Sequence, residues 1–149
     1  GEGVTEKIKN TGNTNGIAFT KALQTRDFEG LAFVNLVDFD MLYGHRRDVA
    51  GYAAAATEFD KFVADFIPGM REGDILMVTA DHGCDPSYTK TTDHTREYVP
   101  YLIYGKGIKP GVDLGTHLCF GTIAQTICEY LGVDASSLDG KSVWNEIKA

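Results

Sequence analysis

Apolar residues along this chain form two kinds of pattern, short continuous runs and longer stripes with helical spacing. The runs are residues 31–37 (LAFVNLV), 75–79 (ILMVT) and 101–104 (YLIY). Runs of this length, rich in bulky and β-branched side chains, are typical of strands that are covered on both faces. They predict three buried strands.

The stripe lies between the first two runs. From Val49 to Ile67 the apolar residues recur at offsets of three and four, which predicts a helix with one face on a sheet. Asp48 is the expected N-cap. Pro68 and Gly69 should end the helix.

Three further elements are expected outside this helix. Residues 121–131 have the same helical spacing, and Gly132 can end that helix in a left-handed conformation. A shorter helix over residues 16–24 would be capped by residues 13–15. Near the end of the chain, Trp144 is expected to dock before a final turn.

The order of these elements predicts the fold class. A strand, a helix and a second strand form a βαβ unit with a right-handed crossover, since parallel strands need such a connection. We therefore expect an α/β fold with a mostly parallel sheet flanked by helices. The length of 149 residues fits one domain with its own core.

Composition limits the partners and the compartment. The net charge of -7, without a basic stripe, argues against nucleic acid as a partner. Apolar runs long enough to cross a bilayer, signal-peptide patterns and repeats are not found in the sequence. Three cysteines without paired spacing indicate a reducing environment, so a cytoplasmic location is expected.

Carboxylate and imidazole side chains follow two of the expected strands. Asp40 and His45 come after residues 31–37, Asp81 and His82 come after residues 75–79, and His94 lies shortly downstream. Strand ends of an open parallel sheet gather at one edge, so these residues can converge. This mixture of ligands suits manganese, zinc or iron. The sequence therefore predicts a divalent-metal site.

The neighbouring polar residues allow more than one reading. Asp38 and Asp93 could orient a metal ligand or form a turn, and Asp85 should shape the turn before Pro86. Arg46, Arg47 and Arg96 could contact phosphate, but solvated or carboxylate-paired side chains are the preferred reading. Cys84 is read as a packed thiol, and His117 as a structural or exposed residue.

Three segments resemble the phosphopentomutase family, which lies within the alkaline phosphatase superfamily. They are residues 38–48 (DFDMLYGHRRD), 79–85 (TADHGCD) and 92–98 (TDHTREY). The resemblance covers essentially the whole chain but only the C-terminal part of a complete family member. It implies part of an alkaline-phosphatase-like core.

The resemblance also implies a cofactor and a division of its ligands. The family uses two manganese ions. Asp81 and His82 match ligands of one ion, whereas Asp40, His45 and His94 match ligands of the other. In the family, an aspartate near the N-terminus and the phosphate-carrying threonine complete the ligand set of the first ion. Both belong to a segment before Gly1. We therefore expect no catalytic nucleophile in this chain, and its substrate-binding residues are unknown.

The activity implied is phosphoryl transfer between the C1 and C5 oxygens of ribose or deoxyribose, through a phosphothreonine and a bisphosphate. The partners implied are a phosphorylated pentose and two absent parts of the same protein, the N-terminal segment and the substrate-holding cap domain. Residues 1–149 alone are expected to be inactive. Two other readings stay open: another superfamily enzyme, such as a cofactor-independent phosphoglycerate mutase, phosphatase or sulfatase, and a non-catalytic metal-binding module.

Overall fold

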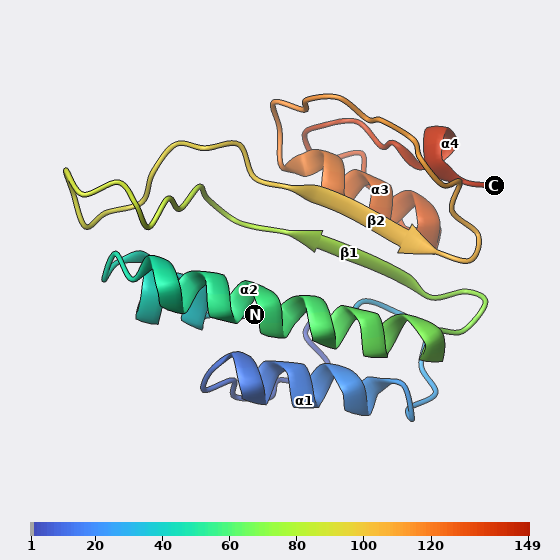
Figure 1. Ribbon diagram of the computed structural model, residues 1–149. Helices are drawn as coiled ribbons and strands as arrows, with labels where there is room; N and C mark the ends of the chain where they lie inside the picture. Colours follow the sequence, from blue (N-terminus) through green and yellow to red (C-terminus); the bar gives the residue numbers. More distant parts are fainter. Residues whose placement is uncertain (1) are drawn as a thin grey trace. The chain divides into compact units, whose positions relative to one another are not determined.

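The computed structural model describes residues 2–149, which group into two compact units (Figure 1). The first unit contains the residues up to 70 and residues 78–102. The second contains residues 71–77 and 103–149. All the predicted metal ligands belong to the first unit, so the geometry of the candidate site can be described within it.

Two helices lie side by side in the first unit, α1 (Asn13–Leu23) and α2 (Val49–Phe66) (Figure 1). The prediction for α2 is confirmed: the Asp48 carboxylate accepts a hydrogen bond of 2.8 Å from the Gly51 amide. Phe62 on α2 is buried, and Lys21 of α1 lies over its ring. A short 3-10 helix, η2 (Ile67–Gly69), ends the segment as its proline predicts.

The start of α1 differs from the sequence prediction. The helix begins at Asn13 with Gly12 as its N-cap, so residues 13–15 belong to the helix and do not cap it. The Asp38 carboxylate instead accepts a hydrogen bond of 2.7 Å from the Asn13 amide, and the Asn13 side-chain oxygen accepts one of 3.0 Å from the Asp38 amide. This pairing spans 25 residues, which is why local spacing did not indicate it.

The second unit contains α3 (Gly121–Leu131) and α4 (Trp144–Ile147). Gly132 ends α3 in the left-handed conformation, with a φ of 67°, as predicted. Trp144 packs against Tyr130 with ring centroids 4.9 Å apart, which confirms the docked tryptophan. The most buried side chains of this unit are Val143, Ile147 and Thr126.

The described strands form a two-stranded sheet of β1 (Ile75–Thr79) and β2 (Tyr101–Gly105). Their arrows run in opposite directions in Figure 1, so this pair is antiparallel. Residues 31–36 have no regular secondary structure and residue 37 lies in a turn, so this run belongs to neither described strand, and Phe33 is 83% exposed. The predicted parallel βαβ unit is therefore not confirmed in the described residues, because the first run joins no hydrogen-bonded ladder there.

None of the helices in residues 2–149 is long and apolar enough to cross a membrane.

Candidate metal centre

Asp40 and His45 lie at the two ends of a π-helical turn, η1 (Phe39–Gly44). The His45 amide donates to the Asp40 carbonyl at 3.0 Å, and the Asp48 amide donates to the Tyr43 carbonyl at 2.9 Å. Each of these hydrogen bonds spans five residues, which is the π-helical spacing. The turn therefore places the side chains of residues 40 and 45 on one side.

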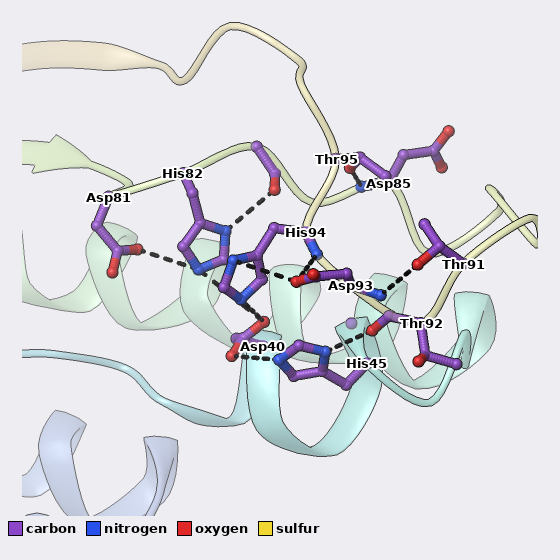
Figure 2. A network of polar contacts seen from close by, with 12 residues as sticks. Asp40, His45, Asp81, His82, Asp85, Thr91, Thr92, Asp93, His94 and Thr95 are labelled. Carbon is purple, nitrogen blue, oxygen red and sulfur yellow. Dashed lines mark hydrogen bonds and ion pairs between the residues drawn. The ribbon is translucent and has the colours of Figure 1, made fainter.

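Three imidazoles face the carboxylate of Asp40 (Figure 2). His45 Nε2 lies 3.3 Å from Oδ2 of Asp40. On the other oxygen, Oδ1, His94 Nε2 lies at 3.6 Å and His82 Nε2 at 4.0 Å. Four of the five predicted ligands thus converge on one point.

Asp81 lies at the margin of this group. Its carboxylate is 3.6 Å from His82 Nε2, and its side chain is 85% exposed. The ring of His82 in turn stacks on that of His94, with centroids 3.6 Å apart. Asp81 therefore contacts the cluster by way of the His82 ring.

The loop that carries His94 is joined to the segment after β1. Gly83 and Thr95 form an antiparallel bridge, and the Thr95 hydroxyl accepts a hydrogen bond of 2.6 Å from the Asp85 amide. A Cβ on Gly83 would meet backbone atoms of Glu97 at 2.6 Å, so only glycine permits this approach. These contacts bring His82 and His94 into the same neighbourhood.

One oxygen of the cluster fits a cation. Asp40 Oδ1 is buried and has no hydrogen-bond partner among the described residues. An unpaired buried carboxylate oxygen is costly, because it has lost water without gaining a donor. Asp40, His45 and His94 can each offer one ligand atom such that all three atoms lie within 4.8 Å of one another. Carboxylate and imidazole together suit a transition metal, so the residues present fit such an ion.

A half-buried thiol and phenol adjoin the cluster. Burial raises the pKa of the Cys84 thiol, and the Asp40 carboxylate raises it further. Burial also raises the pKa of the Tyr52 hydroxyl, with smaller contributions from Cys84 and Asp40. A Cβ on Gly44 would lie 2.5 Å from Cys84 Sγ, so the thiol packs closely on the π-helical turn. This geometry agrees with the packed reading of Cys84.

The remaining candidates have mainly structural contacts. Asp38 pairs with Asn13, as described above. Asp93 Oδ1 accepts from the His94 amide at 2.8 Å, and Asp85 Oδ1 accepts from the Ser87 amide at 2.8 Å, which forms the expected turn. His117 is exposed and its Nε2 lies 3.1 Å from the Leu114 carbonyl.

Sequence reasoning missed the role of Arg47. It favoured a solvated or carboxylate-paired side chain, whereas the guanidinium of Arg47 donates to backbone carbonyls around the cluster, including Thr91 at 2.8 Å. A neighbouring arginine, Arg46, is exposed. Nothing in the sequence distinguishes the two, because the difference arises from the loop that folds over one of them.

A sequence profile of the Metalloenzyme superfamily matches residues 1–135 of this chain. The chain belongs to this superfamily. Its candidate ligands therefore occur in a protein class that is named for its metal chemistry, and the alkaline-phosphatase-like fold expected from the sequence agrees with this membership.

The predicted resemblance to phosphopentomutases is also confirmed. The chain is 51% identical over 147 residues to the phosphopentomutase of Acetivibrio thermocellus, and the match covers 99% of the chain. It is 52% identical over 146 residues to that of Lachnoclostridium phytofermentans and 48% identical over 147 residues to that of Desulfitobacterium hafniense. The chain spans 37% of the length of each of these relatives.

Proposed function

We propose that this chain is the metal-binding part of a phosphopentomutase, an isomerase that interconverts ribose or deoxyribose 1-phosphate and 5-phosphate. The observation that carries the proposal is the convergence of Asp40 with three imidazoles, in a chain about half identical to phosphopentomutases. The buried, unpaired Oδ1 of Asp40 supports a cation at this point.

The cofactor of the complete enzyme would be two manganese ions. Asp40, His45 and His94 would hold one, and Asp81 with His82 would contribute to the other. Such ions neutralise the charge on a transferring phosphoryl group and orient the attacking and leaving oxygens. The chain's own residues position that charge, which is the main task of a protein in phosphoryl transfer.

The rest of the site would come from outside these 149 residues, since the relatives are longer. We infer that an N-terminal segment with the threonine nucleophile and a cap domain that holds the pentose phosphate are needed. With them, residues 31–37 would become a strand of a mostly parallel sheet. The reading of residues 1–149 as one α/β domain, in a cytoplasmic protein that does not bind nucleic acid, stays a prediction.

A chimera tests this function directly. Residues 1–149 replace the matching segment of the Acetivibrio thermocellus protein, and the purified chimera with manganese is assayed for ribose 5-phosphate formed from ribose 1-phosphate. We expect turnover by the chimera and none by residues 1–149 alone. His45→Ala and His94→Ala should abolish turnover, whereas His117→Ala, at an exposed histidine of the second unit, should leave it unchanged.

The alternatives predict different results. A folded chimera that hydrolyses phosphate esters without forming ribose 5-phosphate would favour another superfamily enzyme. A folded chimera that binds manganese but is inactive would favour a non-catalytic module. Turnover by the 149-residue chain, in proportion to its concentration, would refute the need for an external nucleophile; Thr79, Thr91 and Thr92 would then be tested as substitutes.

A further inference from the structure

The side chain of Arg47 contacts four backbone carbonyls of the first unit. Nε donates to Thr91 at 2.8 Å, and one terminal nitrogen donates to both Gly44 and Asp85 at 3.2 Å. The other terminal nitrogen donates to Asp93. A planar guanidinium with several fixed donors is suited to such a set, whereas an ammonium group has its donors on one atom.

These carbonyls belong to the segments that carry the candidate ligands. Gly44 ends the π-helical turn between Asp40 and His45, whereas Thr91 and Asp93 directly precede His94. His45 adds a third contact, because its Nδ1 lies 2.5 Å from the Thr92 carbonyl. Residues 91–93 are therefore held by three successive carbonyls, as Figure 2 shows for the middle one.

The loop needs such contacts because it has little packing of its own. Thr91, Thr92, Asp93 and His94 are all exposed, and they lie outside regular secondary structure. An exposed loop moves readily unless its backbone is hydrogen-bonded to a more rigid element. His94 is the least buried member of the three-residue ligand group, so its position depends most on how the loop is held.

The backbone of Arg47 is also unusual. Its φ of 55° lies in the left-handed region, and it is the one non-glycine residue with positive φ in the described chain. Side chains other than glycine, asparagine and aspartate rarely adopt this conformation, which persists where surrounding contacts impose it. An arginine at this position therefore points to a requirement for its side chain, since glycine would be less strained.

We propose that Arg47 is a positioning residue that holds residues 91–94 against the π-helical turn, so that His94 Nε2 lies beside Asp40 before a cation binds. Arg47 contacts no ligand atom itself; it acts through the carbonyls of Thr91 and Asp93. The inference rests on the proposed metal site for its consequence. Groups that orient metal ligands without binding the metal themselves typically contribute roughly 10–100-fold to metal affinity.

The first test uses the metal-free 149-residue chain, so it does not depend on the proposed function. Hydrogen exchange is compared for Arg47→Met, Arg46→Met and the unchanged chain. We expect Arg47→Met to lose protection at the Thr95 amide, which donates to Gly83 at 3.2 Å, while amides around Phe62 in α2 stay protected. Arg46→Met removes the same charge one residue away and should change neither region. Unchanged protection at Thr95 in Arg47→Met would overturn the positioning role.

The second test measures manganese and zinc affinity by calorimetry. Arg47→Gly relieves the backbone but deletes the guanidinium, and we expect it to weaken binding roughly 10–100-fold. Free guanidinium, added far below denaturing concentrations, should restore part of the affinity. Arg47→Lys keeps the charge but should retain little of the metal affinity that the guanidinium supplies, because one ammonium group cannot reach four separated carbonyls.

Full metal affinity in Arg47→Gly or in Arg47→Lys would overturn the proposal. Equal losses of protection at the Thr95 amide in Arg46→Met and Arg47→Met would also overturn it, since they would indicate an effect of charge alone. If the unchanged chain binds neither metal, the proposed site fails, and the exchange experiment still decides whether Arg47 holds the loop. If Arg47→Gly does not fold, Arg47→Lys provides the decision.

Discussion

The imidazole of His45 lies 3.3 Å from the carboxylate of Asp40, although the two residues are five positions apart along the chain. In an α-helix, residues five apart point in directions roughly 140° from each other, because each residue turns the helix by about 100°. The π-helical turn of Phe39–Gly44 brings them onto one side. The local backbone conformation is therefore a requirement of the candidate site.

Gly44→Ala tests this requirement. The added Cβ would lie 2.5 Å from Cys84 Sγ and 3.0 Å from the Phe39 carbonyl, so the turn must shift. We expect a loss of about 1–3 kcal/mol in the free energy of unfolding, typical of overpacking, together with weaker metal binding. Chemical denaturation and calorimetry measure the two effects.

Gly107→Ala is the matched control for this substitution, because a Cβ at Gly107 meets nothing within 4 Å. It should leave both stability and metal affinity nearly unchanged. Cys84→Ala added to Gly44→Ala should recover part of the stability, since it removes the nearer of the two contacts. Wild-type metal affinity in Gly44→Ala would argue against a role for the turn.

The division of ligands predicts different effects for the histidines. His45→Ala and His94→Ala each remove one member of the three-residue group of Asp40, His45 and His94, so metal affinity at the tightest manganese or zinc site should fall by more than 100-fold. This loss exceeds the roughly 10–100-fold typical of residues that only orient the ligands. His82→Ala should affect a weaker second site. Calorimetry of the 149-residue chain and each variant separates the two, with His117→Ala as control.

Metal affinity should also depend on pH. Neutral imidazole is the form that binds a cation, so protons compete with the metal and affinity should fall as the solution pH is lowered. The dependence should be steeper for the unchanged chain than for His45→Ala.

If His82→Ala abolished the tightest site while His45→Ala and His94→Ala left it intact, the division of ligands would be wrong.

The hydroxyl of Thr126 tests the core of the second unit. Thr126 is fully buried; its Oγ1 donates to the Thr122 carbonyl at 2.7 Å and accepts from the Val143 amide at 3.1 Å. Thr126→Val keeps the shape but leaves the Val143 amide without its acceptor, so the free energy of unfolding should fall by about 1–3 kcal/mol. Thr57→Val, at an exposed threonine with the same type of helical hydrogen bond, should have little effect.

Asp85 predicts a pH effect with a defined sign. Hydrogen bonds from the Ser87 hydroxyl and amide lower the pKa of the Asp85 carboxyl below its usual value. Because the pKa is lower in the folded state, the stabilisation is present above the ordinary aspartate pKa and is lost as the pH falls through the folded pKa. NMR titration should place the Asp85 midpoint below that of unfolded aspartate, and Ser87→Ala should raise it.

The sequence by itself determined the elements whose causes are local. The boundaries of α2 followed from its apolar stripe, the Asp48 cap and Pro68, and those of α3 from its stripe and Gly132. The strand at residues 75–79 was correct for the same reason. Its motifs also selected the candidate ligands, because the kinds of side chain that bind a transition metal can be recognised without coordinates.

Tertiary structure decided what depends on distant partners. Residues 31–37 have the composition of a strand but join no strand pair in the described structure, because a strand needs the hydrogen bonds of a neighbouring strand. The Asn13 amide at the start of α1 donates to Asp38, and the guanidinium of Arg47 donates to the carbonyl of Thr91, more than 40 residues away. The approach of His94 to Asp40 likewise arises from chain folding. Spacing along a sequence indicates local geometry, whereas a site assembled from separate segments depends on the folding of the backbone between them.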